Sequence, residues 1–157
     1  MRGNAGVLIG ILDEQIILTK RSANLRSFTS QVCLPGGKYD DLDGGIVATA
    51  IREFHEEIDF KGNIDVIACL FPEASIVSGQ SVYPIIANLS GMINGFNQDE
   101  VERLLLLDMH LLDENLFSVN PDYPNIRHNR CFNFAGERVW GLTAHILYEF
   151  WQQYINK

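Results

Sequence analysis

Cysteine is scarce in this chain, with only three among 157 residues. Cys33, Cys69 and Cys131 are odd in number and widely spaced, and they lack the CxxC spacing of a zinc site. Neither a disulfide framework nor a cysteine-type zinc site is therefore expected. Reduced thiols are typical of the cytoplasm, which is the location that the composition favours.

Basic residues and long apolar runs are lacking as well. Lys and Arg total 12 against 20 Asp and Glu, for a net charge of −8, so we expect no binding to nucleic acid or to anionic membranes. No apolar run approaches the ~20 residues that span a membrane. The run at 7–12 is broken by Gly10 and followed by Asp13, so no signal peptide is evident. An anionic substrate would therefore need local basic residues and a metal ion.

What is present fits one globular domain over residues 1–157, with 46% hydrophobic and 20% charged residues. Apolar runs predict strands at 5–12, 15–20, 32–34, 63–69, 82–89, 104–112, 131–134 and 137–139. The turn-rich residues 90–99 are expected to form a loop over the active site, and residues 113–130 a long irregular loop. A final helix, capped by Thr143, closes the chain.

The chemistry is concentrated in residues 35–60. Pro35-Gly36-Gly37 is a turn signal, and helical periodicity begins at Ile46, with Asp43 as a candidate N-cap. The expected apolar stripe consists of Ile46, Val47, Ala50, Ile51 and Phe54.

Three carboxylates, those of Glu53, Glu56 and Glu57, project from one side of this helix, since each residue advances it by about 100°. Such clustered oxygen ligands suit Mg²⁺ or Mn²⁺. The alternative is a solvated acidic face. That alternative is disfavoured because like charges at this spacing repel by roughly 0.2–0.5 kcal/mol per pair.

The stretch resembles the signature of the Nudix hydrolases. Gly37 matches its leading glycine, and Arg52, Glu53, Glu56 and Glu57 match its Arg-Glu-hydrophobic-x-Glu-Glu ending. The interval between the glycine and the arginine is one residue longer than in the general pattern. The glutamate expected early in the motif is also missing.

The longer interval is similar to that of the coenzyme A diphosphatase group, whose motif opens GG-x-x-D-x-x-D. Gly36, Gly37, Asp40 and Asp43 match that opening, and residues 140–144 look like the group's closing WGLTA. Its upstream motif is matched by Leu18, Thr19, Arg21, Ser22, Leu25, Arg26, Val32 and Pro35. Two positions depart from it, with Phe28 in place of histidine and Ser30 in place of glycine.

This resemblance implies an α+β fold, an α/β/α sandwich with a mixed sheet between helices. It also implies hydrolysis of coenzyme A or acyl-coenzyme A to 3′,5′-ADP and 4′-phosphopantetheine. Glu53, Glu56 and Glu57, completed by the Gly36 carbonyl, would hold Mg²⁺ or Mn²⁺. Arg52 would orient a motif carboxylate, a role in which Asp43 replaces the missing glutamate.

The resemblance also suggests residues outside the motif. Glu100 is the candidate base that deprotonates the attacking water, and Glu102 and Glu73 are the next candidates. Lys20, Arg21 and Arg26 are expected to bind substrate phosphates, since cations pair with phosphate oxygens. A surface loop that balances nearby acids is the alternative for this basic segment.

Two other functions stay open at this point. The departures at Phe28 and Ser30 favour another Nudix substrate, such as ADP-ribose, NADH or a dinucleoside polyphosphate. A binding or regulatory protein that has lost turnover is the second alternative, although a pure binder has no need of three repelling carboxylates. A homodimer is compatible with such a fold, and no residue argues for it.

Overall fold

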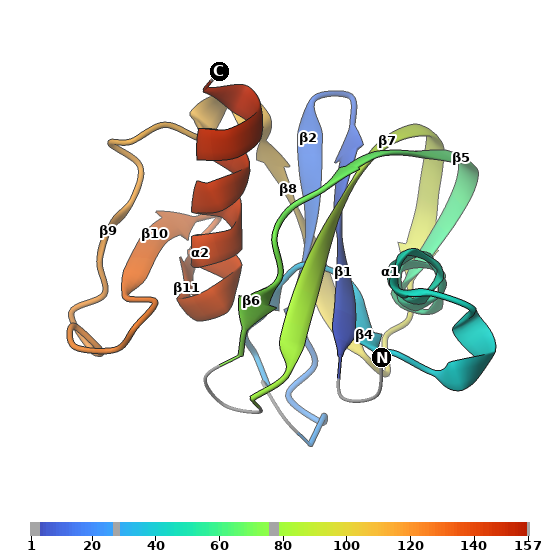
Figure 1. The fold of residues 1–157 in the computed structure, drawn as a ribbon, viewed down its shortest axis with the longest axis horizontal. Helices are drawn as coiled ribbons and strands as arrows, with labels where there is room; N and C mark the ends of the chain where they lie inside the picture. The colour runs from blue at the N-terminus through green and yellow to red at the C-terminus, as the bar shows by residue number, and fades with distance from the viewer. Residues whose placement is uncertain (1–3, 27–28, 76–78, 157) are drawn as a thin grey trace.

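The computed structural model describes residues 4–26, 29–75 and 79–156. Eleven strands and two α-helices follow one another along the described chain (Figure 1). The strands are β1 (Ala5–Leu12), β2 (Gln15–Arg21), β3 (Val32–Cys33), β4 (Gly36–Lys38), β5 (Ile58–Cys69), β6 (Glu73–Ala74), β7 (Ser81–Phe96), β8 (Val101–Asp108), β9 (Ser118–Val119), β10 (Arg130–Phe134) and β11 (Glu137–Trp140). The helices are α1 (Ile46–Glu57) and α2 (Gly141–Phe150), with 3₁₀ turns at Asp41–Asp43 and Met109–Leu111 and a π turn at Trp151–Ile155.

The main sheet is mixed, because β1 pairs in parallel with β7 and antiparallel with β2. Its principal order is β3-β2-β1-β7-β5, while β4 pairs with β1, β6 with β7, and β8 with β2. A second, three-stranded sheet has the order β11-β10-β9. The β1–β2 and β10–β11 hairpins confirm the pairing that the alternating runs predict.

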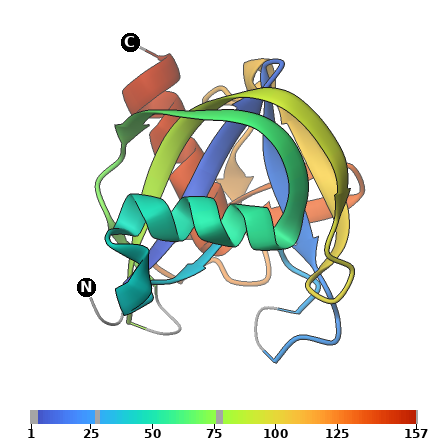
Figure 2. The same ribbon diagram turned by 90° about the vertical axis from the view of Figure 1, so that its right-hand side faces the viewer.

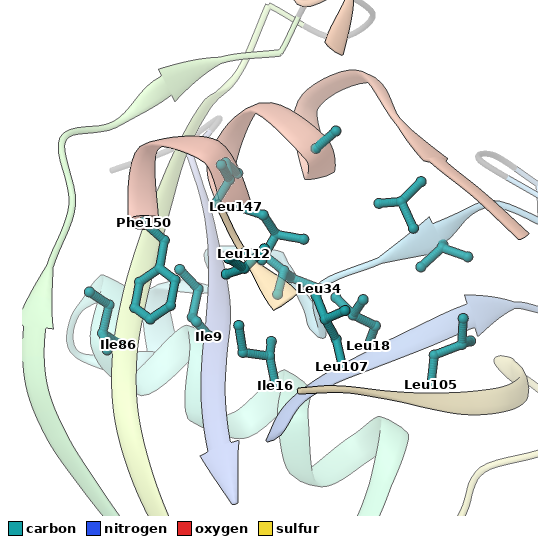
Figure 3. Close-up of a cluster of buried hydrophobic side chains, with 14 of the residues drawn as sticks. Ile9, Ile16, Leu18, Leu34, Ile86, Leu105, Leu107, Leu112, Leu147 and Phe150 are labelled. Atoms are coloured by element: carbon teal, nitrogen blue, oxygen red, sulfur yellow. The ribbon is translucent and has the colours of Figure 1, made fainter. Parts of the chain in front are cut away.

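The central strands are buried on both faces, and alternate side chains belong to different cores because successive residues of a strand point to opposite sides. Leu8 and Ile17 pack with Phe54 of α1. Their neighbours Ile9 and Ile16 pack with Phe150 and the rest of the α2 stripe (Figure 3). The two helices therefore cover opposite faces of the sheet (Figures 1 and 2). This arrangement confirms the expected α+β sandwich.

The expected loop at 90–99 is wrong for most of its length, because β7 continues to Phe96 and pairs with β5 from Ile58 onward. Gly62 and Gly91 face each other in this long hairpin, at φ 151° and 149°. A Cβ on Gly62 would lie 2.0 Å from the Ser90 carbonyl oxygen, so both glycines permit a backbone approach that side chains forbid. Glycine here marks a bend within strands instead of the end of one.

Both expected helix caps are also wrong. α1 begins after Gly45, which provides no side-chain cap, and the Asp43 carboxylate instead accepts hydrogen bonds from Asp40 N, Thr49 and Arg52. α2 begins at Gly141, so Thr143 lies inside its first turn. In the described part of the chain, no helix has the length and apolar character needed to cross a membrane.

Gly62→Ala should lower the free energy of unfolding by about 2–3 kcal/mol, because it introduces both a backbone clash and a strained φ. Thermal denaturation checks this, with an expected fall of roughly 4–12 °C. Gly45→Ala is the matched control, since a Cβ there meets nothing within 4 Å. Equal melting temperatures for the two variants would contradict the role assigned to the glycine pair.

Candidate active site

A cleft of about 610 Å³ lies where β1, β4 and α1 meet the turn into α2. Its polar lining comes from several segments that are distant in sequence. Among the residues that line it are Arg21, Gln31, Gly36, Gly37, Glu53, Glu57, Glu100, Tyr123, His128 and Trp140. Three of the predicted acidic residues and one of the predicted basic residues therefore share one cavity.

Arg52 uses all five of its N–H donors within the protein. Its Nε and Nη2 donate to the two oxygens of Asp43, at 2.6 and 3.0 Å, and Nη2 also donates to the Lys38 carbonyl. Its Nη1 donates to Glu53 and Glu56, at 3.0 and 3.1 Å. A guanidinium has no further donor to offer. Arg52 therefore has no donor left for a ligand, and Asp43 is the carboxylate that pairs with it, as predicted for the residue that replaces the missing glutamate.

Glu57 is buried, with 4% of its surface exposed, and its Oε2 accepts a hydrogen bond of 3.0 Å from Gly36 N. The pKa of Glu57 is raised to about 8, chiefly by burial and also by the charges of Glu53 and Glu100, while the Gly36 hydrogen bond and the charge of Arg21 lower it. An ionised Glu57 is therefore costly in the protein alone. A cation bound beside it would relieve that cost.

Glu53 lies against the glycine turn. A Cβ on Gly37 would come within 2.5 Å of the Glu53 carboxyl carbon, so only glycine leaves room for this side chain. The pKa of Glu53 is also raised, first by burial and then by the charge of Glu56. Glu56 itself is exposed and does not line the cleft.

Glu100 lines the cleft from a turn that is held by the end of α1. Asn97 N donates to the Glu57 carbonyl at 2.9 Å, and Glu100 N donates to the Asn97 carbonyl at 3.1 Å. The Glu100 Oε2 is buried and has no hydrogen-bond partner. A buried acceptor without a donor is unusual, so this oxygen is available to a ligand or a water molecule.

The donor set at this wall of the cleft consists of oxygens. Carboxylates of Glu53, Glu57 and Glu100 are close enough for their charges to influence one another. Hard oxygen ligands of this kind fit Mg²⁺ or Mn²⁺ and do not favour softer ions. The roles assigned to these glutamates, and to the Gly36 carbonyl, stay predictions.

The alternative bases occupy other surroundings. Glu102 is exposed and pairs with Lys20 at 3.1 Å, and Glu73 pairs with His145 at 3.2 Å. Neither of these glutamates lines the cleft. Glu100 is therefore the best placed of the three candidates.

The three basic residues do not act as a group. Arg21 lines the cleft, whereas Lys20 lies between Glu137 and Glu102, at 3.0 and 3.1 Å, which raise the pKa of its ammonium group. Arg26 is exposed and lies outside the cleft. The structure thus favours only Arg21 for contact with a substrate bound there.

Phe28 and Ser30 are the two residues that depart from the upstream motif. Phe28 lies outside the described residues. Ser30 has φ 59°, in the left-handed region where glycine is favoured, and its N–H donates to the Arg21 carbonyl at 3.1 Å. The serine thus keeps the turn geometry that a glycine would adopt with less strain.

Sequence reasoning did not assign the aromatic part of the cleft. Tyr123 and Trp140 stack with ring centroids 5.1 Å apart, and both line the cleft from the α2 side of the sandwich. Tyr123, an aromatic residue in the irregular stretch before β10, is the hint that the sequence gives of this surface. It could not be used without knowing that the stretch folds back over the start of α2.

Comparison with known proteins identifies relatives over most of the chain. Residues 1–126 match the model of the NUDIX domain. A protein described as an uncharacterized Nudix hydrolase, NudL, from Pectobacterium atrosepticum is 34% identical over 92% of this chain and 79% of its own length. NudL of Yersinia pestis is 30% identical over 95% and 78%, respectively.

Solved structures resemble the fold at lower sequence identity. A NUDIX hydrolase from Nitrosomonas europaea aligns with a TM-score of 0.62, at 14% identity, over 99% of this chain and 74% of that chain. The MutT protein from Methanosarcina mazei aligns with a TM-score of 0.61, at 14% identity, over 98% and 94%. These likenesses support the architecture alone.

Glu57→Gln should stabilise the metal-free protein at high pH. The folded state holds a proton on Glu57 up to about pH 8, while the unfolded chain loses it near pH 4.5, so stability falls as the pH rises between these values. In chelator at about pH 8.5 the variant should melt roughly 4–8 °C above wild type, the equivalent of ~2 kcal/mol.

Near pH 5 the two proteins should melt much closer together, because the wild-type carboxyl is then protonated and resembles the amide. The comparison between the two pH values is the internal control. A melting-temperature difference that does not grow with pH would show that burial does not raise the pKa of Glu57.

Proposed function

The chain belongs to the NUDIX family and is a Nudix pyrophosphohydrolase, and from this premise we propose that it hydrolyses the diphosphate of coenzyme A or an acyl-coenzyme A. The products would be 3′,5′-ADP and a 4′-phosphopantetheine. The observation that carries the proposal is one cleft that joins Glu53, Glu57 and Glu100 to Arg21 and an aromatic stack. The motif residues around Arg21, Gly36 and Trp140 favour this substrate over others.

The cleft suits a large ligand with an anionic centre. Its volume of about 610 Å³ falls in the range of sites that enclose whole organic cofactors. Arg21 offers a cation to phosphate oxygens, and the Tyr123–Trp140 pair offers flat apolar surface. Such a surface suits a nucleobase or the pantetheine arm.

The carboxylates would hold one or more Mg²⁺ or Mn²⁺ ions. Glu53 and Glu57 are the ligands we propose, with Glu56 at the exposed margin and the Gly36 carbonyl beside Glu57. A bound ion of this kind would neutralise diphosphate charge and lower the pKa of the attacking water. Arg52 fixes the directions of Glu53 and Glu56 without touching the substrate.

Glu100 is the base that we propose for the hydrolysis. Its unpartnered Oε2 would accept a proton from the water as the water oxygen bonds to phosphorus. The bond between that phosphorus and the bridging oxygen breaks, so the water oxygen stays on the attacked phosphate, the other phosphate departs with the bridging oxygen, and both products are phosphomonoesters.

The deciding experiment is a hydrolysis panel with Mg²⁺ or Mn²⁺. Coenzyme A and acetyl-coenzyme A would be compared with ADP-ribose, NADH and a dinucleoside polyphosphate. Coenzyme A should give the highest kcat/KM, and Glu57→Gln should remove nearly all turnover of every substrate. A preference for ADP-ribose or another compound would discard the coenzyme A assignment while leaving the carboxylate chemistry in place.

Arg21→Ala should raise KM by roughly 10- to 100-fold, because a charge-assisted hydrogen bond contributes about 1.5–3 kcal/mol. Arg26→Ala is the matched control, as an exposed arginine five positions along the same segment. Steady-state kinetics would measure both variants. A larger KM effect at Arg26 than at Arg21 would reverse the assignment.

Glu100→Gln should lower kcat by roughly 10²- to 10⁴-fold, since it removes a general base. Glu102→Gln should leave kcat near the wild-type value, because that carboxylate pairs with Lys20 outside the cleft. Both variants replace a carboxylate with an amide, and the two positions lie two residues apart. If Glu102→Gln is the slower enzyme, Glu100 is not the base.

A further inference from the structure

A second cluster of metal-ligating side chains lies apart from the carboxylates of α1. Glu73 of β6, His128 from the segment before β10 and His145 of α2 place one ligand atom each within 4.8 Å of one another. His145 Nε2 lies 3.2 Å from Glu73 Oε1, and the two imidazole rings stack with centroids 4.0 Å apart. Residues distant in sequence are thus gathered at one point.

His128 is buried, Glu73 and His145 are partly buried, and the cluster is incompletely hydrogen-bonded. His128 is 5% exposed as a residue, and the side chain of His145 is 12% exposed. His128 Nε2 and His145 Nδ1 are buried without a hydrogen-bond partner. An unmade hydrogen bond at a buried polar atom costs about 1–3 kcal/mol. Such atoms call for an explanation, and an ion is one of the ordinary ones.

We propose that Glu73, His128 and His145 bind a late first-row divalent ion, of which Zn²⁺ is the representative. Two imidazoles and one carboxylate form a borderline-soft donor set that suits Zn²⁺ and disfavours Mg²⁺. Donor atoms on a tetrahedral zinc ion lie roughly 3.3 Å apart, given bonds of ~2.0–2.1 Å. The 3.2 Å between Glu73 and His145 already matches that separation.

His128 is the ligand that must move. Its ring is inclined by only 20° to that of His145, so the lone pairs of the stacked rings run nearly side by side and do not converge. The ring has to turn out of the stack to reach a shared ion. His128 lies in an irregular segment outside any strand or helix, where such a turn needs no break in secondary structure.

The site would affect the cleft because His128 also lines it. An ion shared by the three side chains would fasten the segment before β10 to β6 and to α2. That segment also carries Tyr123, which is stacked on Trp140 in the cleft wall. Three protein ligands leave one tetrahedral position for water or a ligand group.

The test starts from Glu53→Gln/Glu57→Gln protein, in which the carboxylate site of α1 is removed. We expect this protein to bind one equivalent of Zn²⁺ in equilibrium dialysis, and Co²⁺ to give the visible spectrum of a tetrahedral site. Adding His128→Gln or His145→Gln should weaken Zn²⁺ binding at least tenfold. His110→Gln is the matched control, because His110 also pairs with a glutamate, Glu14, but has no second histidine.

Zn²⁺ binding that is unchanged by His128→Gln and His145→Gln would overturn the proposal. A measurement without these substitutions guards against misfolding. The chain has four histidines, and one equivalent of Zn²⁺ should shift the ring nitrogen signals of two, His128 and His145, in a nuclear magnetic resonance spectrum. Shifts of His55 and His110 instead, or no shift at all, would also overturn it. Neither readout depends on which substrate the enzyme hydrolyses.

Discussion

Arg52 holds the acidic wall of the cleft together through five hydrogen bonds to oxygen atoms. It donates to both oxygens of Asp43 in the turn before α1, to the Lys38 carbonyl, and to one oxygen each of Glu53 and Glu56 on the helix. Without this cation, the three carboxylates of Asp43, Glu53 and Glu56 would repel one another. The guanidinium therefore allows a high carboxylate density, and because its five N–H donors are all used, none is left for Glu57.

Two carboxylates that Arg52 does not contact, those of Glu57 and Glu100, line the cleft. Glu57 is buried with one backbone donor, and Glu100 presents a buried oxygen with none. The ionised form of Glu57 is less stable in the protein than it would be in water, since burial penalises charge. The divalent cation proposed for this site would therefore stabilise the protein when it binds. Binding of the proposed ion and stability of the fold would then be linked through the same side chains.

The sandwich divides the cleft between its two outer layers. α1 supplies Glu53 and Glu57, and the turn after β7 supplies Glu100, while Tyr123, His128 and Trp140 line the cleft from the α2 side. The doubly buried sheet fixes one layer relative to the other, because its alternating side chains belong to both cores. The fold thus places carboxylate oxygens and aromatic surface in the same cleft, where one ligand could contact both.

The sequence alone determined the local features. Helical periodicity placed Glu53, Glu56 and Glu57 on one side of α1, and period-two runs located the β1–β2 and β10–β11 hairpins, because these patterns follow from hydrogen bonds between near neighbours. Tertiary structure decided which charges meet. It made Asp43 the partner of Arg52 instead of a helix cap, and it gave Lys20 to Glu137 while leaving Arg21 in the cleft.

Two further outcomes were decided only in three dimensions. The facing glycines, Gly62 and Gly91, turned an expected loop into a bent hairpin, and Glu73, His128 and His145 came together from separate elements. The spacing of residues along the chain does not predict such contacts between distant segments. They depend on how the layers pack over distances far longer than one turn of helix, which is the part of the fold that local pattern leaves open.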